Sequence, residues 1–190
     1  IYNSREPVQP VDPDITPEEI HLRTSEQLIA LLKQKEGFRA TAYWDYAQYS
    51  IGYGSACTKD EYPNGITEAQ ADILLRKMLQ KFETSLDKFL QDSNLTLTDN
   101  QYDALISLTY NIGAGWMKDT RLSKLLQSGN YTNNEIASAI GIWCHVKENG
   151  VTSIHNGLVS RRIADKIRAA EIHNEIFGSD HCPVELVIDL

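Results

Sequence analysis

Apolar side chains recur every three or four positions along most of the chain from Ser25 onward, which is the spacing of one face of an α-helix. The first such face carries Leu28, Leu31 and Leu32. Ser25 can cap this helix by accepting a hydrogen bond from a free backbone N–H group of the first turn. The pattern therefore predicts a helix that begins after Ser25 and ends near Glu36.

Further helices are predicted where a Thr precedes a similar apolar pattern. A capping Thr accepts a hydrogen bond from the backbone three residues later, and a Glu or Gln at that position can return one. The chain offers Thr67 with Gln70, Thr98 with Gln101, Thr120, and Thr132 with Glu135. The helices that follow are expected to cover about 68–91, then to end near Gly113 and Gly129, then to run through Trp143, with a last helix over about 158–177.

One aromatic segment, residues 42–55, interrupts the helical pattern. It is rich in Tyr, and it ends in the sequence Ile51-Gly52-Tyr53-Gly54. Aromatic and β-branched residues with interspersed glycines are typical of short antiparallel strands joined by tight turns. The sequence therefore predicts an α+β fold, mainly helical, with one small β-hairpin region between the first two helices.

The first 24 residues differ in composition from the rest of the chain. Four of the six prolines lie here among acidic residues, which favours a stiff acidic leader, a linker from an upstream domain, or a disordered end. We expect one compact domain over 25–177 and a C-terminal tail over 178–190. Because the sequence begins at Ile1, a processed or excised fragment is expected.

Composition narrows the function classes. The hydrophobic content of 42% is that of a globular domain, and 18 basic against 26 acidic residues give a net charge of −8. Nucleic-acid binding needs clustered Lys and Arg to neutralise phosphates, so this balance argues against it. No apolar run approaches the roughly 20 residues of a membrane-spanning helix, so no membrane span is expected.

The cysteines and histidines of the chain indicate neither a disulfide framework nor a metal site. The three cysteines, Cys57, Cys144 and Cys182, fit either three incidental thiols or one disulfide with a free thiol. The five histidines have no H-x-x-x-H or C-x-x-C partners. We therefore expect neither a metal nor an organic cofactor.

Two carboxylates bracket the change from helix to hairpin. Glu36 ends the first predicted helix beside apolar Phe38, where partial burial favours the protonated form. Asp45 follows nine residues later among tyrosines and Gln48, a polar setting that favours the ionised form. Glycoside hydrolysis needs such a pair, one group to protonate the leaving oxygen and one to assist water or stabilise the sugar cation.

The strings around these carboxylates resemble the active-site segment of phage-type lysozymes, glycoside hydrolase family 24. They read Glu36-Gly37-Phe38-Arg39, Ala42-Tyr43-x-Asp45 and Ser50-Ile51-Gly52-Tyr53-Gly54. The resemblance continues with Tyr110-Asn111-Ile112-Gly113, Trp143 and Gly157-Leu158-Val159-x-Arg161-Arg162. Together the motifs cover about residues 25–177 in the family's order.

This resemblance implies a fold with a small β-containing lobe and a larger helical lobe joined by a long helix. It implies a peptidoglycan substrate, cut at the β-1,4 bond between N-acetylmuramic acid and N-acetylglucosamine. By the same resemblance, Glu36 is the proton donor, Asp45 assists the attacking water, and Ser50 helps to hold that water. Inversion with a carboxyl separation of roughly 6.5–9.5 Å is then expected.

The sequence departs from the family pattern at the hairpin. Ser50 stands where the family has Thr, which keeps the hydroxyl and loses the methyl group. Only five positions lead from Asp45 to Ser50 where the family has six, so the hairpin is expected to be one residue shorter. Ser55 also stands where many members have His.

Four residues are candidates for binding the glycan: Tyr43, Tyr53, Asn111 and Arg161. The two tyrosines can stack on sugar rings or pack beneath the sheet, and Asn111 can bind an acetamide or cap its helix. Arg161 and Arg162 can reach substrate or hold acidic partners. Trp143 fits the core better than a sugar platform.

Two alternative functions stay open at this point. A lytic transglycosylase uses the muramic 6-hydroxyl in place of water, and a wall-binding or tail module keeps the fold without catalysis. We expect a monomer that acts on the cell wall, secreted or periplasmic, of phage or bacterial origin. An upstream domain joined through the Pro-rich leader is a further expected partner.

Overall fold

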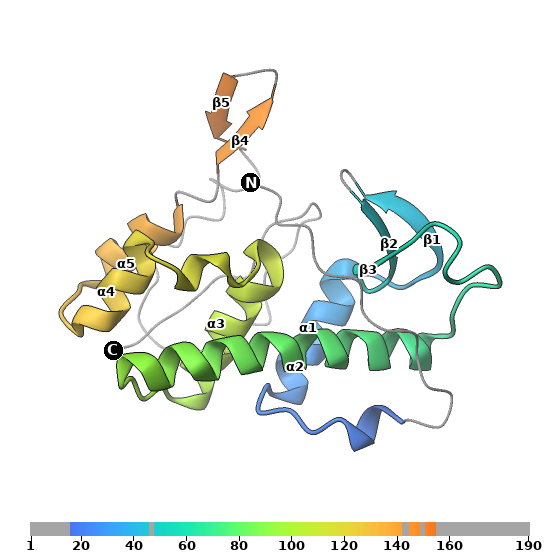
Figure 1. The fold of residues 1–190 in the computed structure, drawn as a ribbon, viewed down its shortest axis with the longest axis horizontal. Coiled ribbons are helices and arrows are strands. Elements are labelled where there is room, and N and C mark those ends of the chain that lie inside the picture. The colour runs from blue at the N-terminus through green and yellow to red at the C-terminus, as the bar shows by residue number, and fades with distance from the viewer. Residues whose placement is uncertain (1–15, 46–47, 142–144, 149–150, 155–190) are drawn as a thin grey trace. The chain divides into compact units, whose positions relative to one another are not determined.

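A computed structural model describes residues 16–45, 48–141, 145–148 and 151–154 (Figure 1). The chain divides into two compact units at the 84–85 peptide bond, within one long helix. The described part of the first unit is residues 16–45 and 48–84, and that of the second begins at Ser85. None of the described helices is long and apolar enough to cross a membrane.

The first unit combines two helices with a small sheet. Its elements are the 3-10 helix η1 (Pro17–Glu19), α1 (Glu26–Glu36), β1 (Arg39–Asp45), β2 (Gln48–Gly52), β3 (Ser55–Cys57) and the first part of α2 (Glu68–Ser93). The mixed, mainly helical fold class and the strand region after the first helix were both predicted from the sequence, and both are confirmed.

Helix α1 forms where the capping signal placed it. Ser25 Oγ accepts a hydrogen bond from the Leu28 N–H at 3.2 Å, and Gly37, with φ of +69°, ends the helix. Leu28 and Leu32 are buried as expected. The third buried residue is Ile29, whereas Leu31 is only half-buried, so the core face is rotated slightly from the predicted one.

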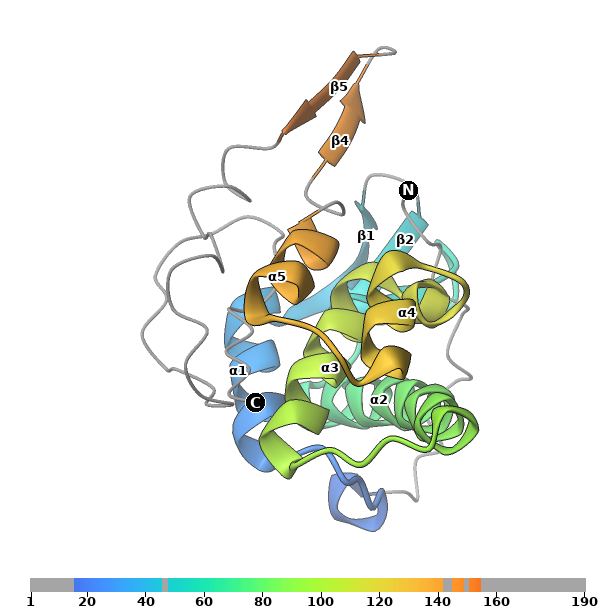
Figure 2. The ribbon, with the colours of Figure 1, turned by 90° about the vertical axis from the view of Figure 1, so that its left-hand side faces the viewer.

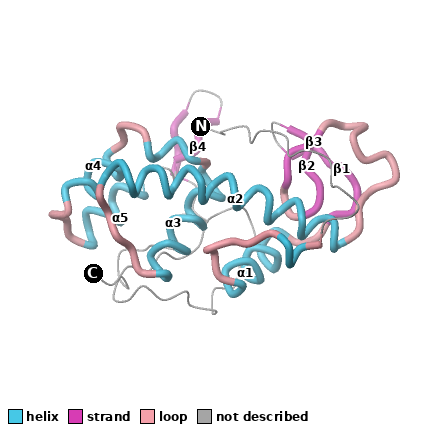
Figure 3. The backbone as a smooth tube through the Cα atoms, turned by 60° about the horizontal axis from the view of Figure 1, so that its bottom comes forward, coloured by secondary structure: helices cyan, strands magenta, loops and turns pink. Residues whose placement is uncertain are grey.

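The three strands form an antiparallel sheet in the order β1-β2-β3, drawn in magenta in Figure 3. In β1 and β2, Tyr43 pairs with Ser50 and Asp45 pairs with Gln48. Only residues 46–47 therefore connect the two strands. That this hairpin is one residue shorter than the family pattern stays a prediction. Directly opposed residues share a face of a sheet, so this register decides which side chains lie beside Asp45.

The chain ahead of α1 is fixed to α2 by a buried carboxylate. Glu83 is 8% exposed, and its Oε1 accepts hydrogen bonds from the backbone N–H of Thr24 at 2.6 Å and from Thr24 Oγ1 at 2.7 Å. Thr24 is itself 4% exposed. Two donors thus compensate the burial of one charged group.

Replacing Thr24 with Val is expected to lower the free energy of unfolding by about 1.5–3 kcal/mol, because a buried carboxylate loses one of its two donors. Urea unfolding monitored by circular dichroism measures this loss. Thr84→Val is the matched control, since the Thr84 hydroxyl makes an exposed bond to the Gln80 carbonyl at 2.9 Å. Equal losses in the two variants would contradict the assignment.

An ion-pair network joins α1 to α2. Arg76 donates to both carboxylate oxygens of Glu26 at 2.7 Å and to Asp72 at 3.1 Å. Hydrogen bonding to Arg76, aided by its charge and opposed by burial, lowers the pKa of Glu26 below its ordinary value of 4.5. Since the folded pKa is the lower one, this pair stabilises the fold above pH 4.5 and loses that effect as the pH falls through the folded pKa.

Glu26→Gln is expected to remove this part of the acid sensitivity. The Glu26 side chain is 72% exposed, so solvent screening limits the effect to less than about 1 kcal/mol. Urea midpoints compared from pH 6 to pH 3 measure the change, with Asp92→Asn in the exposed Lys88–Asp92 pair as the control. A Glu26→Gln curve parallel to the wild-type curve over this range would disprove the linkage.

The second unit is mainly helical. It contains the end of α2, α3 (Asp99–Ile112), the 3-10 helix η2 (Ala114–Met117), α4 (Arg121–Ser128), α5 (Asn133–Gly141), β4 (His145–Glu148) and β5 (Val151–Ile154). Figure 2 shows α3, α4 and α5 from the side. The predicted capping pairs are confirmed by hydrogen bonds that close both ways, at Thr98–Gln101 and Thr132–Glu135.

The core of this unit is built around Trp116. Its ring meets the Phe89 ring edge-on at 5.5 Å, and its Nε1 donates to Thr109 Oγ1 at 2.9 Å. Tyr102 is fully buried, and its hydroxyl donates to Asp87 at 3.0 Å. Each buried polar group named here therefore has a partner, as burial requires.

The β4–β5 hairpin corrects the prediction of a single strand region. The two strands pair antiparallel with Glu148 opposite Val151, so Asn149 and Gly150 connect them. An Asn-Gly pair followed by the β-branched residues Val151 and Thr152 is a strong hairpin signal, which the helical pattern did not include. The described part of helix α5 is Asn133–Gly141. Trp143 and the helix expected over 158–177 lie outside the described residues.

Candidate active site

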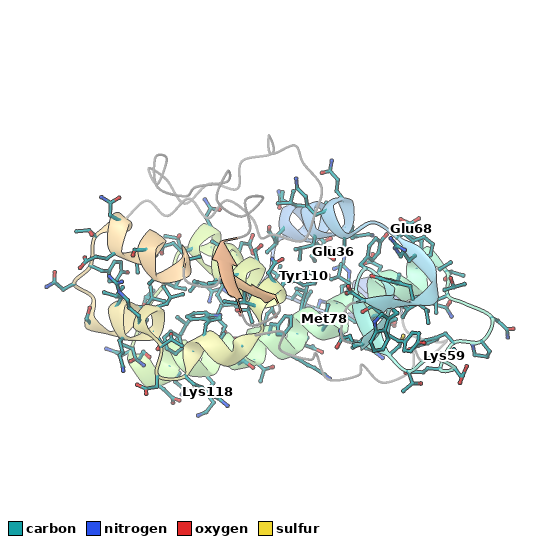
Figure 4. All side chains as sticks on the ribbon, turned by 90° about the horizontal axis from the view of Figure 1, so that it is seen from above. Glu36, Lys59, Glu68, Met78, Tyr110 and Lys118 are labelled. Carbon is teal, nitrogen blue, oxygen red and sulfur yellow. The ribbon has the colours of Figure 1, made fainter. Side chains whose placement is uncertain are left out.

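Glu36 is the last residue of α1, and its side chain is half-buried. Figure 4 labels it. The chain turns away directly after it because Gly37 adopts φ of +69° and donates its N–H to the Lys33 carbonyl. A helix C-terminus carries partial negative charge from its unpaired carbonyl groups.

Asp45 is the last residue of β1 and is half-buried. Because Asp45 pairs with Gln48 and Tyr43 pairs with Ser50, the side chains of all four lie on one face of the hairpin. Asp45 and Ser50 are diagonal neighbours on that face, an arrangement with a Cα separation of roughly 7–8 Å. The register thus brings together two of the three predicted catalytic residues.

Ser50 is fully buried. Its Oγ has no hydrogen-bond partner in the part of the chain that the structure describes. A buried hydroxyl without a partner is uncommon in folded proteins and costs free energy. A water molecule bound between Asp45 and Ser50 would supply that partner, but it requires the side chains that cover the hydroxyl to move.

The two tyrosines predicted to bind the glycan differ in environment. Tyr43 lies on the Asp45 face, half-buried, with the Arg39 guanidinium carbon 4.5 Å from its ring centroid. Tyr53 is 2% exposed, and its hydroxyl donates to Glu68 Oε1 at 2.7 Å. Burial and the Glu68 carboxylate both raise the pKa of the Tyr53 hydroxyl. Tyr53 is therefore not available to a sugar in this conformation.

Asn111 lies near the end of α3 in the second unit. Its Nδ2 donates to the Ser107 carbonyl one turn earlier at 2.8 Å, which leaves its amide oxygen as the acceptor for other groups. Arg161, with the rest of the Gly157–Arg162 motif, lies outside the described residues.

Two features near the candidate site were not predicted. On the opposite face of the hairpin, Trp44 is 60% exposed and meets the Tyr49 ring edge-on at 5.2 Å. On α2, Glu68 and Asp72 bind Tyr53 and Lys33, respectively. The signal for the second feature was present in the sequence, because Glu68, Asp72 and Arg76 are spaced by four residues and share a helix face.

Cys57 is a buried free thiol in β3. Burial and the Glu61 carboxylate raise its pKa to about 11, so the thiol is a poor nucleophile. Cys144 and Cys182 lie outside the described residues.

The helix-terminal Glu and the strand-borne Asp and Ser, set in a mainly helical fold with a small sheet, define a lysozyme-like protein. A model of the family described as phage lysozyme matches residues 33–165. The chain therefore belongs to the phage lysozyme family.

Several curated relatives are endolysins. The chain is 35% identical to the endolysin of Bacillus phage B103 over 74% of its length and 51% of the relative's. It is 34% identical to the endolysin of Acyrthosiphon pisum secondary endosymbiont phage 1, over 76% of its length and 96% of the relative's. The chain thus spans about half of the Bacillus phage endolysin it matches and nearly all of the second relative.

Solved structures agree with this assignment. The muramidase domain of SpmX from Asticaccaulis excentricus matches with a TM-score of 0.59 and 30% identity, over 73% of this chain and 90% of that one. The endolysin from Escherichia coli O157:H7 phage FAHEc1 matches with a TM-score of 0.59 and 32% identity, over 75% of this chain and 89% of that one.

Proposed function

We propose that the chain is a muramidase that hydrolyses the β-1,4 bond between N-acetylmuramic acid and N-acetylglucosamine in peptidoglycan. The observation that carries the proposal is the placement of Glu36 at a helix end together with Asp45 and Ser50 on one strand face. Membership of the phage lysozyme family and relatives named as endolysins and a muramidase domain support the same substrate.

In the proposed reaction, Glu36 donates its proton to the glycosidic oxygen as the bond to the anomeric carbon of the muramic acid breaks. Asp45 accepts a proton from a water molecule, whose oxygen attacks that carbon from the opposite face. The products are a reducing-end N-acetylmuramic acid of inverted configuration and a free 4-hydroxyl on N-acetylglucosamine. Inversion requires a carboxyl separation of roughly 6.5–9.5 Å, which stays a prediction.

The other proposed roles are auxiliary. Ser50 orients the water once its covering neighbours move, and Tyr43 offers a ring on the same face as Asp45. Asn111 and Arg161 are proposed to bind the glycan from the rest of the domain, which we place at residues 25–177. The leader over 1–24 is proposed to join an upstream module. Because the chain carries a net charge of −8, such a module would help it reach an anionic wall.

The alternative reaction is a lytic transglycosylation, in which the muramic 6-hydroxyl replaces water. Asp45 and Ser50 on a shared face favour hydrolysis, since transglycosylation has no water to activate. A module that binds the wall without cutting it is the second alternative.

Digestion of purified sacculi by the 190-residue chain tests the proposal. We expect soluble muropeptides with reducing N-acetylmuramic acid ends, detected by mass spectrometry. Products lighter by one water molecule would instead identify a transglycosylase. Binding to sacculi in a pull-down without release of fragments would identify a non-catalytic module.

A further inference from the structure

One face of α2 holds three separate parts of the first unit. Glu68, Asp72 and Arg76 are one turn apart, so their side chains line one side of the helix. Glu68 accepts from the Tyr53 hydroxyl at 2.7 Å, and Asp72 accepts from Lys33 Nζ at 3.1 Å. Arg76 binds Glu26 near the start of α1, as described above. The helix thus fixes both ends of α1 and the residue that follows β2.

Tyr53 contacts both α2 and the chain at the end of α1. The centroid of the Tyr53 ring lies 6.0 Å from that of the Phe38 ring, and Lys33 Nζ lies 5.4 Å from the Tyr53 centroid. Phe38 is two residues after Glu36, and Tyr53 is three residues after Ser50. The Tyr53 ring therefore contacts the chain just beyond the proposed acid and is continuous with the strand that carries Ser50.

The Lys33 ammonium group adds a second contact between the end of α1 and α2. Lys33 is one turn before Glu36, and its carbonyl accepts the Gly37 N–H that ends the helix. Its side chain is bound to Asp72, whose own side chain is only 14% exposed. The last turn of α1 is thus held from its side-chain face by α2 and from its C-terminal end by Phe38 against Tyr53.

We propose that Tyr53, held by Glu68, is a positioning residue that sets the Glu36 carboxyl against the Asp45–Ser50 face of the hairpin during cleavage of the glycosidic bond. This inference rests on the proposed muramidase activity. Catalytic groups must be held within about 0.5 Å of the productive geometry, and a misplacement of about 1 Å costs on the order of 10²-fold in rate. A fixed hydroxyl–carboxylate bond at the base of the hairpin supplies that restraint.

The test is a double-variant cycle in turnover. Tyr53→Phe keeps the ring contacts and loses the bond to Glu68, whereas Glu68→Leu removes the acceptor. Each is expected to lower kcat on soluble, uncrosslinked glycan strands by roughly 10-fold, with KM unchanged within about twofold. The double variant is expected to lose no more than either single variant. Glu68→Gln keeps an acceptor oxygen and is expected to retain most of kcat.

Tyr102→Phe is the matched control. Tyr102 is also buried, and its hydroxyl also donates to a carboxylate, that of Asp87 at 3.0 Å, in the second unit. Both Tyr→Phe changes should lower the urea midpoint of unfolding by a similar amount, because each leaves a carboxylate without one donor. Only Tyr53→Phe should lower kcat when both proteins are assayed well below their unfolding temperatures.

Three results would overturn the inference: equal kcat values for Tyr53→Phe and Tyr102→Phe, additive losses in the double variant, or a loss in Glu68→Gln as large as in Glu68→Leu. If Tyr53→Phe fails to fold, the comparison of Glu68→Gln with Glu68→Leu still tests whether the bond between Tyr53 and Glu68 affects kcat. Failure of the proposed function is distinct, because the wild-type chain would then release no reducing ends.

Discussion

Replacing Glu36 with Gln is expected to reduce the release of reducing ends from peptidoglycan on the order of 10³-fold, because the amide has no proton to give the leaving oxygen. The two side chains have nearly the same shape, so the urea midpoint is expected to change little. Reducing-end counting on purified sacculi, with circular dichroism on the same samples, measures both quantities.

Asp92→Asn is the control for this change, since Asp92 is an exposed partner of Lys88 on α2 and has no proposed role in the reaction. It makes the same carboxyl-to-amide substitution and is expected to keep full activity. Wild-type rates in Glu36→Gln would refute the acid assignment and leave the family fold untouched.

Asp45→Asn distinguishes hydrolysis from lytic transglycosylation, since both reactions use Glu36 as the proposed acid. In hydrolysis, Asp45 accepts a proton from water, so its amide should lower the rate severely. In transglycosylation the nucleophile belongs to the substrate, and the anhydro product should persist. Mass spectrometry measures the amounts of hydrated and anhydro muropeptides. Loss of the hydrated product in Asp45→Asn indicates hydrolysis, and an anhydro product that persists indicates transglycosylation.

Gly52→Ala is expected to have the largest effect on stability. Gly52 ends β2 with φ of +64°, and an added Cβ would lie 2.9 Å from Ala71 Cβ and 3.3 Å from Ala71 Cα. The backbone conformation costs a side chain about 1–2 kcal/mol, and overpacking against the buried helix adds about 1–3 kcal/mol. The free energy of unfolding should fall by roughly 2–5 kcal/mol, measured by urea denaturation.

Gly129→Ala is the matched control. Gly129 has φ of +62° at the end of α4, and an added Cβ there would meet no atom within 4 Å. Only the cost of placing a side chain at a positive φ, about 1–2 kcal/mol of unfolding free energy, should remain. Equal losses in the two variants would show that the contact between β2 and Ala71 relaxes freely, contrary to the close packing described here.

The local elements were predictable because their causes are local. Ser25, Thr98 and Thr132 each cap a helix through atoms within three residues, so the sequence contains the whole interaction. The β4–β5 hairpin is equally local, and its Asn-Gly signal was available but overlooked. The sequence therefore contains the information for this hairpin as well.

The candidate site was only partly predictable. The spacing of Glu36, Asp45 and Ser50 was visible in the sequence, but that Asp45 and Ser50 share a face follows from the pairing of Asp45 with Gln48. A slip of one residue would have put them on opposite faces. The burial of Tyr53 was not predictable either, since its partner Glu68 is 15 residues away on a different element.

The sequence by itself therefore determined helices α1 to α5, the caps of α1, α3 and α5, the first strand region and the family of this protein. Only the tertiary structure decided which aromatic rings are buried, which carboxylate holds the chain before α1, and which contacts Lys33 and Phe38 make near the end of α1. The physical reason is distance along the chain: the bond from Thr24 to Glu83 joins residues 59 positions apart. No local pattern specifies such a bond, because it exists only once the helices have packed.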